Sequence, residues 1–215
     1  MEDQHKEDFT PQPRKESKEL KKLLHRKMRA HVCDSIRWTR LANFSLAATL
    51  TFVALAVSQT PAPYTQQVAV MKLIRPGLTT IGVMTSSLSE KSIENIVRAA
   101  EAQGLKIIIA KPQQPSEIAE LYDKLVGGKK IELLWIPDPS DKMLLGMGFN
   151  FLREKALGDK IGILVPTEDL VSSGALCSIM KDNGKLMAYV NERIAPLVGA
   201  SVPSGPPSSV TYITK

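Results

Sequence analysis

The sequence predicts an α/β domain with a single doubly wound, mainly parallel sheet of five or six strands and helices on both faces. From Leu78 onward, short apolar runs alternate with segments of helical periodicity, which is typical of βαβ units. The run from Leu133 to Pro137 is almost unbroken in its apolar character, as expected for a strand buried on both faces. A composition with 43% hydrophobic and 23% charged residues agrees with a globular α/β domain.

Each expected strand is a β-branched or apolar run that stops at turn residues. In chain order the expected strands are Thr79–Met84, Leu105–Ala110, Leu133–Pro137, Ile161–Val165, Gly174–Ile179 and a short Val210–Ile213. Trp135 lies in the third of these, so its side chain is expected in the core.

The helices follow from apolar residues spaced three and four apart. Ser87 and Glu90 have capping-box spacing ahead of the first helix. Pro115 opens the second helix, and an apolar stripe over residues 143–151, with Met143, Leu144, Met147 and Phe151, marks the third. A brief turn is expected over 167–171 and a last helix over about 184–195.

The beginning of the chain has a different character from the rest. Residues 1–40 form a basic, polar segment, and the uncharged residues 41–57 predict a hydrophobic helix that is either a signal-peptide core or a membrane anchor. Residues 58–77 are then a lead-in, with an extended start, to a lobe over 78–215. Starting at Met28 would leave a conventional basic region before this helix. Both alternatives predict export to the periplasm, either free or anchored to the inner membrane.

The net charge of +6 does not indicate nucleic-acid binding. Residues 1–41 hold 11 Lys/Arg and 7 Asp/Glu, whereas residues 57–215 hold 17 and 15. The expected lobe is therefore almost neutral, and its cations are scattered instead of forming one basic face.

Metal and catalytic chemistry are not expected either. All three histidines precede residue 32, and the two cysteines form no CxxC pair, so we expect no metal site and no nucleophile–histidine pair. Phosphate-binding glycine motifs and a GxSxG elbow are missing. The sequence therefore predicts a protein without cofactor that is not an enzyme.

Small polar residues follow the expected strands at their carboxyl ends. Ser86 and Ser87 follow the first strand, Asp138 follows the third and Thr167 follows the fourth. In a parallel sheet these ends share one edge, where ligands bind. Hydroxyls and a carboxylate without a reactive base suit recognition of a small polar molecule. The alternative for each residue is helix capping, above all for Ser87 and for Ser140 or Asp141.

From about Met71 the sequence resembles the second lobe of substrate-binding proteins of ABC transporters, of the tryptophan/tyrosine receptor type. The resemblance rests on the order and spacing of several short segments: Ile74-Arg-Pro-Gly, Ile81-Gly-Val-Met, Ala102-Gln-Gly-Leu, Leu134-Trp-Ile-Pro-Asp and Val171-Ser-Ser-Gly-Ala-Leu. It implies a lobe of the type I periplasmic-binding fold. It also implies contacts to an amino-acid-like solute at Ser86, Ser87 and Asp138 and near Thr167, and an ABC permease as partner.

The first lobe of that family has no counterpart in this sequence, so two hypotheses stay open. One is a reduced solute-binding protein that binds its ligand weakly or as a homodimer. The other is a ligand-free periplasmic interaction module that serves a sensor kinase or an outer-membrane receptor.

Overall fold

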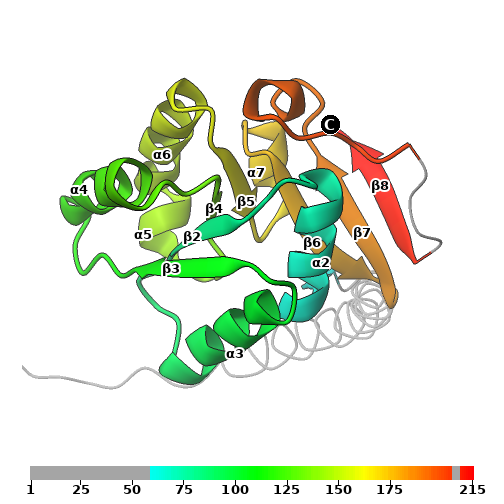
Figure 1. The fold of residues 1–215 in the computed structure, drawn as a ribbon, viewed down its shortest axis with the longest axis horizontal. Helices are drawn as coiled ribbons and strands as arrows, with labels where there is room; N and C mark the ends of the chain where they lie inside the picture. The colour runs from blue at the N-terminus through cyan, green and yellow to red at the C-terminus, as the bar shows by residue number, and fades with distance from the viewer. Residues whose placement is uncertain (1–58, 205–208) are drawn as a thin grey trace, which may run out of the picture. The chain divides into compact units, whose positions relative to one another are not determined.

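The computed structural model describes residues 59–204 and 209–215. They form a mixed sheet of eight strands with the order β3-β2-β4-β5-β6-β7-β8, and β1 pairs separately with β6. Four strands in the middle of the chain run parallel, as predicted: β2 (Thr80–Met84), β3 (Lys106–Ala110), β4 (Leu133–Trp135) and β5 (Gly162–Val165). The expected mainly parallel α/β sheet is thus confirmed, with more strands than the five or six predicted (Figure 1).

The other strands extend the sheet beyond β5. β6 (Cys177–Asp182) is parallel to β5, and β7 (Lys185–Val190) is antiparallel to β6. The last strand, β8 (Val210–Thr214), pairs in parallel with β7, and the two-residue β1 (Thr60–Pro61) pairs antiparallel with the end of β6.

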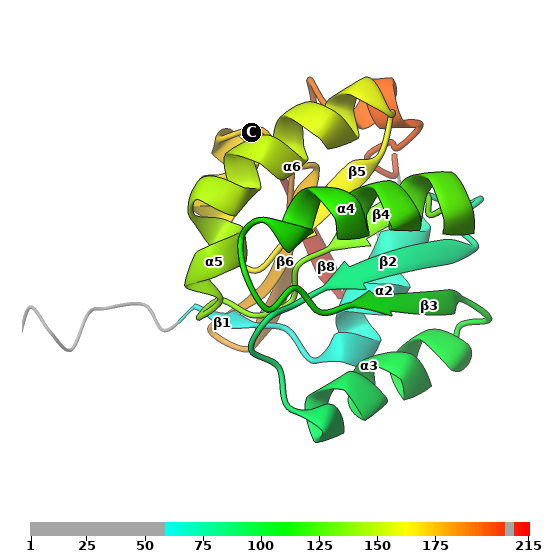
Figure 2. The same ribbon diagram turned by 90° about the vertical axis from the view of Figure 1, so that its left-hand side faces the viewer.

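Helices cover both faces of the sheet, as predicted, and each face has its own core (Figure 2). One face packs against α2 (Tyr64–Ile74), α3 (Glu90–Glu101) and the 3₁₀ turn η2 (Ala195–Val198). The helical elements on the other face are α4 (Glu117–Asp123) with the π turn η1 (Lys124–Gly128), α5 (Lys142–Leu145), α6 (Met147–Gly158) and α7 (Glu168–Ser172). Trp135 is fully buried between sheet and helices, as expected.

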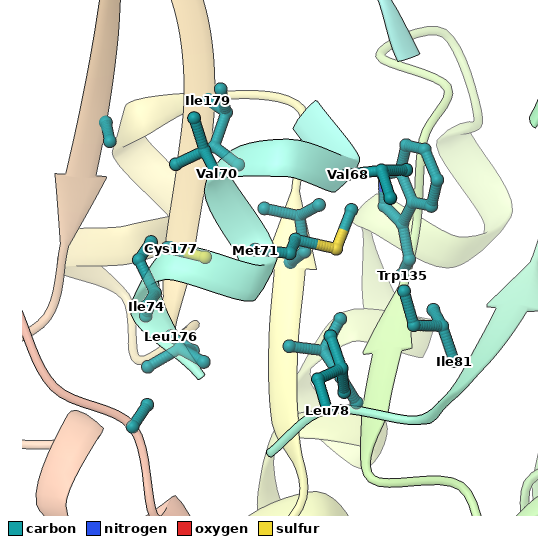
Figure 3. Packing of buried hydrophobic residues seen from close by; sticks show 14 of the residues in the cluster. Val68, Val70, Met71, Ile74, Leu78, Ile81, Trp135, Leu176, Cys177 and Ile179 are labelled. Carbon is teal, nitrogen blue, oxygen red and sulfur yellow. The ribbon is translucent and has the colours of Figure 1, made fainter. Parts of the chain in front are cut away.

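Helix α2 was not expected, because residues 58–77 were interpreted as a lead-in. The extended start around Pro61 is observed, but the chain turns helical directly after Pro63. Val68 and Met71 then pack onto the sheet near Trp135 (Figure 3), and they are almost completely buried. This helix therefore belongs to the core of the domain.

The predicted last helix over 184–195 was wrong. Asp182 pairs with Lys185, so only Asn183 and Gly184 connect β6 to β7. Both have positive φ, 49° and 78°, which is the backbone of a tight two-residue hairpin and suits an Asn-Gly pair. The segment then continues as a strand. Residues 188–190 are buried on both faces of the sheet, and a helix on the surface could not bury all of them.

Three further details differ from the prediction. Helix α3, which is the first of the predicted helices, is capped by Ser89, whose Oγ accepts from the Ser92 amide at 3.2 Å. Ser87 is therefore not the cap. The stripe over 143–151 is divided between α5 and α6 at Gly146, and Met147 is 87% exposed instead of buried. The brief turn expected after β5 is the short helix α7.

The N-terminal predictions, including the hydrophobic helix over 41–57 and the alternative start at Met28, lie outside the described residues. Within the described ranges, the helices are too short or too polar to cross a membrane.

Candidate functional site

The carboxyl ends of β2 and β4 form the topological switch point of the sheet. The two strands are direct neighbours. From β2 the chain runs through α3 to β3 on one face, whereas from β4 it runs through α5 and α6 to β5 on the other face. Connections that leave in opposite directions open a crevice outside the strand ends, where open α/β sheets bind ligands.

Ser87 and Asp138, both predicted site residues, meet at this switch point. The Ser87 hydroxyl donates to Asp138 Oδ2 at 2.6 Å. The amide and the hydroxyl of Ser140 donate to Asp138 Oδ1 at 2.8 and 2.7 Å. Partial burial alone would raise the pKa of Asp138, but these three hydrogen bonds outweigh it and lower the pKa below its ordinary value. Asp138 is therefore ionised at neutral pH.

Ser86, also a predicted site residue, is held by Asp141. The Ser86 amide and hydroxyl donate to the two Asp141 carboxylate oxygens at 2.7 and 2.8 Å. The same carboxylate accepts from the Leu144 amide at 3.1 Å and so caps α5, as the capping alternative predicted for Asp141. Asp141 is 1% exposed, so its function is to join the β2 loop to α5.

Thr167, the fourth predicted site residue, does not join this group. It follows β5 on the same edge and precedes α7, and among the described hydrogen bonds none connects it to Ser86, Ser87 or Asp138. Of the four predicted residues, the structure thus joins Ser87 directly to Asp138, whereas Ser86 is bonded to Asp141 and Thr167 lies apart.

A cavity of about 580 Å³ adjoins Asp138. Its wall combines the loop after β4, the first turn of α2 and the middle of α3. The residues that line it are mostly apolar or aromatic, and they include Pro61, Pro63, Tyr64, Leu88, Pro137 and Pro139. A cavity of this size with a few polar groups in an apolar wall is typical of a small-molecule site.

Tyr64 is the aromatic residue in this wall. Its ring meets the buried Trp135 ring edge to face, with centroids 5.7 Å apart and an interplanar angle of 77°. Burial raises the pKa of the Tyr64 hydroxyl, the nearby Ser92 side chain acts in the opposite direction, and the negative charge of Asp138 adds to the rise. Tyr64 and Asp138 are therefore close enough for the charge of Asp138 to affect the Tyr64 hydroxyl.

The cavity also has polar groups from α3, Asn95 and Arg98. The Arg98 guanidinium lies 3.5 Å from the Glu94 carboxylate, and both side chains are mostly exposed to solvent. Tyr64 was not predicted because it lies on the unexpected helix α2, and Asn95 and Arg98 were not predicted because they lie within α3 and not at the end of a strand. The prolines at 61 and 63 were the available signal for a structured segment there.

Metal binding and a cysteine nucleophile are the other kinds of chemistry to consider in the part of the chain that the structure describes. In these residues, no group of three or more His, Cys, Asp or Glu side chains is placed to hold a metal ion. Cys177 is buried in β6, and burial raises the pKa of its thiol to about 12, so it is a poor nucleophile at neutral pH.

Comparison with known proteins matches the chain to solved structures. An ABC domain in complex with L-Trp from Streptococcus pneumoniae shares 23% identity over 66% of this chain and 57% of its own, with a TM-score of 0.55. A ligand-free, open substrate-binding protein with adhesive properties from Clostridium difficile shares 19% identity over 68% and 58%, with a TM-score of 0.52. A conserved domain protein from Vibrio cholerae shares 17% over 72% and 60%, with a TM-score of 0.58. No protein-family model and no curated protein sequence matches.

The domain has the fold of one lobe of a substrate-binding protein. This confirms the fold and the resemblance that the sequence predicted. The chain spans 57 to 60% of the length of these three structures.

Proposed function

We propose that the domain binds a small, amino-acid-like molecule in the cavity beside Asp138. One observation carries the proposal: the largely apolar cavity of about 580 Å³ adjoins Asp138 at the switch point of the sheet. Asp138 supplies a fixed, ionised carboxylate, and Tyr64 with its neighbouring prolines supplies apolar surface. The L-Trp complex of the similar S. pneumoniae domain supports a solute of this kind.

We further propose that the domain works after export, facing the periplasm, as part of an ABC-type uptake or sensing system. The support is the uncharged segment 41–57 in the sequence and the substrate-binding-protein fold of the lobe. A homodimer would bring a second lobe to the ligand, and an ABC permease would receive it.

A thermal-shift screen of the full chain against amino acids, nucleosides and small organic acids tests this function. A ligand at 100 times its dissociation constant adds about 2.7 kcal/mol to the stability, which raises the melting temperature by several degrees. We expect a hit among the amino acids or their derivatives. If a well-folded protein shows no shift with any compound, binding of an amino-acid-like molecule is refuted.

One observation favours the alternative, a protein-interaction module for a sensor kinase or receptor. Met147 is 87% exposed at the start of α6. Next to it is a small cavity of about 250 Å³ lined by apolar residues such as Pro115 and Phe151. A missing thermal shift together with a partner whose binding is lost in Met147→Glu would establish this function.

A further inference from the structure

We propose that the cavity beside Asp138 binds its ligand through an ammonium group and does not need a ligand carboxylate, so that it prefers organic amines. This inference rests on the proposed function and narrows its ligand class. Three features support it: the charge of Asp138, the lining of the cavity and the exposed ion pair of Arg98.

The negative charge of Asp138 has no cationic partner among the described residues. Its three hydrogen-bond donors, one from Ser87 and two from Ser140, are all neutral groups. A carboxylate offers about four acceptor positions, so one position stays free on Oδ2, which accepts only from Ser87. An ammonium group is the natural donor for that position, because a charged hydrogen bond is stronger than a neutral one.

The wall of the cavity also suits a cation with an apolar body. Tyr64 presents an aromatic ring near Asp138, and aromatic rings attract ammonium groups placed over their faces. The prolines on either side of Asp138, Pro137 and Pro139, and Leu88 offer apolar surface for the rest of the molecule. A carboxylate in this place would face the Asp138 charge.

Among the described residues that line this cavity, Arg98 is the one cation, and it is a weak candidate for binding a carboxylate. Its guanidinium already lies 3.5 Å from Glu94, and the side chain is mostly in water. An exposed charge pair of this kind contributes little binding energy. Of the two charged groups, Asp138 is therefore the one held in place by several hydrogen bonds, and its charge favours a cation.

Matched compounds that carry an ammonium group, a carboxylate or both on the same aromatic body test the inference with the full chain at neutral pH. The indole series is tryptamine, tryptophan and indole-3-propionate, and tyramine, tyrosine and 4-hydroxyphenylpropionate form a phenol series. We expect the amine to bind at least as tightly as its amino acid in calorimetric titration, and at least tenfold more tightly than the acid. Asp138→Asn should weaken amine binding at least tenfold, whereas Asp169→Asn, at an exposed carboxylate on α7, should not change it.

The salt dependence of the wild-type protein gives a second readout that does not depend on how a variant folds. Amine affinity should fall as sodium chloride rises from 50 to 500 mM, because salt screens a partly exposed charge pair. An amino acid that binds tenfold more tightly than its amine, an acid that equals the amine, or an affinity independent of salt would overturn the inference. In each of these cases the cavity still binds a ligand and the proposed function stands, whereas a complete lack of binding refutes the function itself.

Discussion

The Ser87 hydroxyl lies 2.6 Å from Asp138 Oδ2 and donates to it, which joins the loops that follow β2 and β4. These two loops flank the switch point, and 51 residues of sequence separate the pair. The contact orients the carboxylate beside the cavity and contributes to lowering its pKa.

Removing the Ser87 hydroxyl should raise the pKa of Asp138. Of the contacts that lower this pKa, the hydrogen bond from Ser87 is the strongest, so Ser87→Ala moves the pKa up toward or past the ordinary value of about 3.9. NMR titration of the Asp138 carboxyl carbon measures the change. Ser86→Ala is the matched control, because Ser86 bonds to Asp141 and not to Asp138. An equal shift in both variants would contradict this assignment.

Asp141→Ala should destabilise the domain by about 1–3 kcal/mol, because it removes the cap of α5 and leaves the buried Leu144 amide without a partner. The carboxylate is buried and accepts from Ser86 and Leu144. Urea unfolding should show a lower midpoint with an unchanged m-value. Asp169→Ala removes an exposed aspartate in the first turn of α7 and should change stability by less than about 0.5 kcal/mol. Similar losses in the two variants would show that Asp141 is not a special anchor.

Two glycines of α6 should respond in opposite ways to alanine. A Cβ at Gly148 would lie 2.6 Å from the Met143 carbonyl oxygen and 3.0 Å from Ile118 Cδ1, so Gly148→Ala should cost about 1–3 kcal/mol. A Cβ at Gly158 would meet nothing within 4 Å, so Gly158→Ala should be neutral or stabilise by up to about 1 kcal/mol. Thermal unfolding of both variants measures the difference. A neutral Gly148→Ala would mean that α5 and α6 do not pack as closely as described.

Protonation of Glu132 should lower the free energy of unfolding of the domain in acid. Burial alone would raise the pKa of Glu132. Hydrogen bonds from the Thr79 and Thr80 amides and from the Thr79 hydroxyl, together with the positive charge of Arg75, lower it. A lowered pKa in the folded state adds stability above the unfolded value of about 4.3, and this stability is lost as the pH falls through the folded pKa.

The comparison of Glu132→Gln with wild type at pH 6 and pH 3.5 measures this contribution through urea midpoints. The variant should lose less stability on acidification than the wild type. Glu101→Gln is the control, since the Glu101 side chain makes no hydrogen bond or ion pair to other described residues. If Glu132→Gln and wild type lose the same stability, the Glu132 contacts do not contribute to acid sensitivity.

The four parallel strands could be predicted because a strand buried on both faces needs an uninterrupted apolar run. Leu133, Leu134 and Trp135 show this directly, since all three are buried on alternating faces. Helix α2 could not be recognised in the same way. Its apolar residues do not form a narrow stripe, and even Gln67 is buried, where its amide donates to the Ala62 carbonyl at 2.6 Å.

The hairpin after β6 shows how one pattern fits two structures. Leu186, Tyr189 and Val190 have helical spacing, yet they also fit a strand with both faces buried. The Asn183-Gly184 pair is the stronger local signal, because its positive φ angles suit a two-residue turn.

The site was predicted only as far as residues at strand ends can show it. Asp138 follows a strand and lines the cavity, whereas Ser86 and Ser87 do not line it; Tyr64 reaches the cavity from helix α2, which precedes β2. Tertiary packing of α2 on Trp135 creates this wall, and local sequence does not reveal such contacts.

A variant that fills the cavity beside Asp138 tests whether a small molecule occupies it. Thr65 is exposed and lines the cavity on α2, so Thr65→Trp should fill part of it without disturbing the core. Leu73→Trp, on an exposed position of the same helix outside this cavity, is the control. Calorimetric titration with the best compound of the screen should show at least tenfold weaker binding for Thr65→Trp and unchanged binding for Leu73→Trp. Unchanged binding in Thr65→Trp would contradict the account, because the ligand would then occupy another part of the domain.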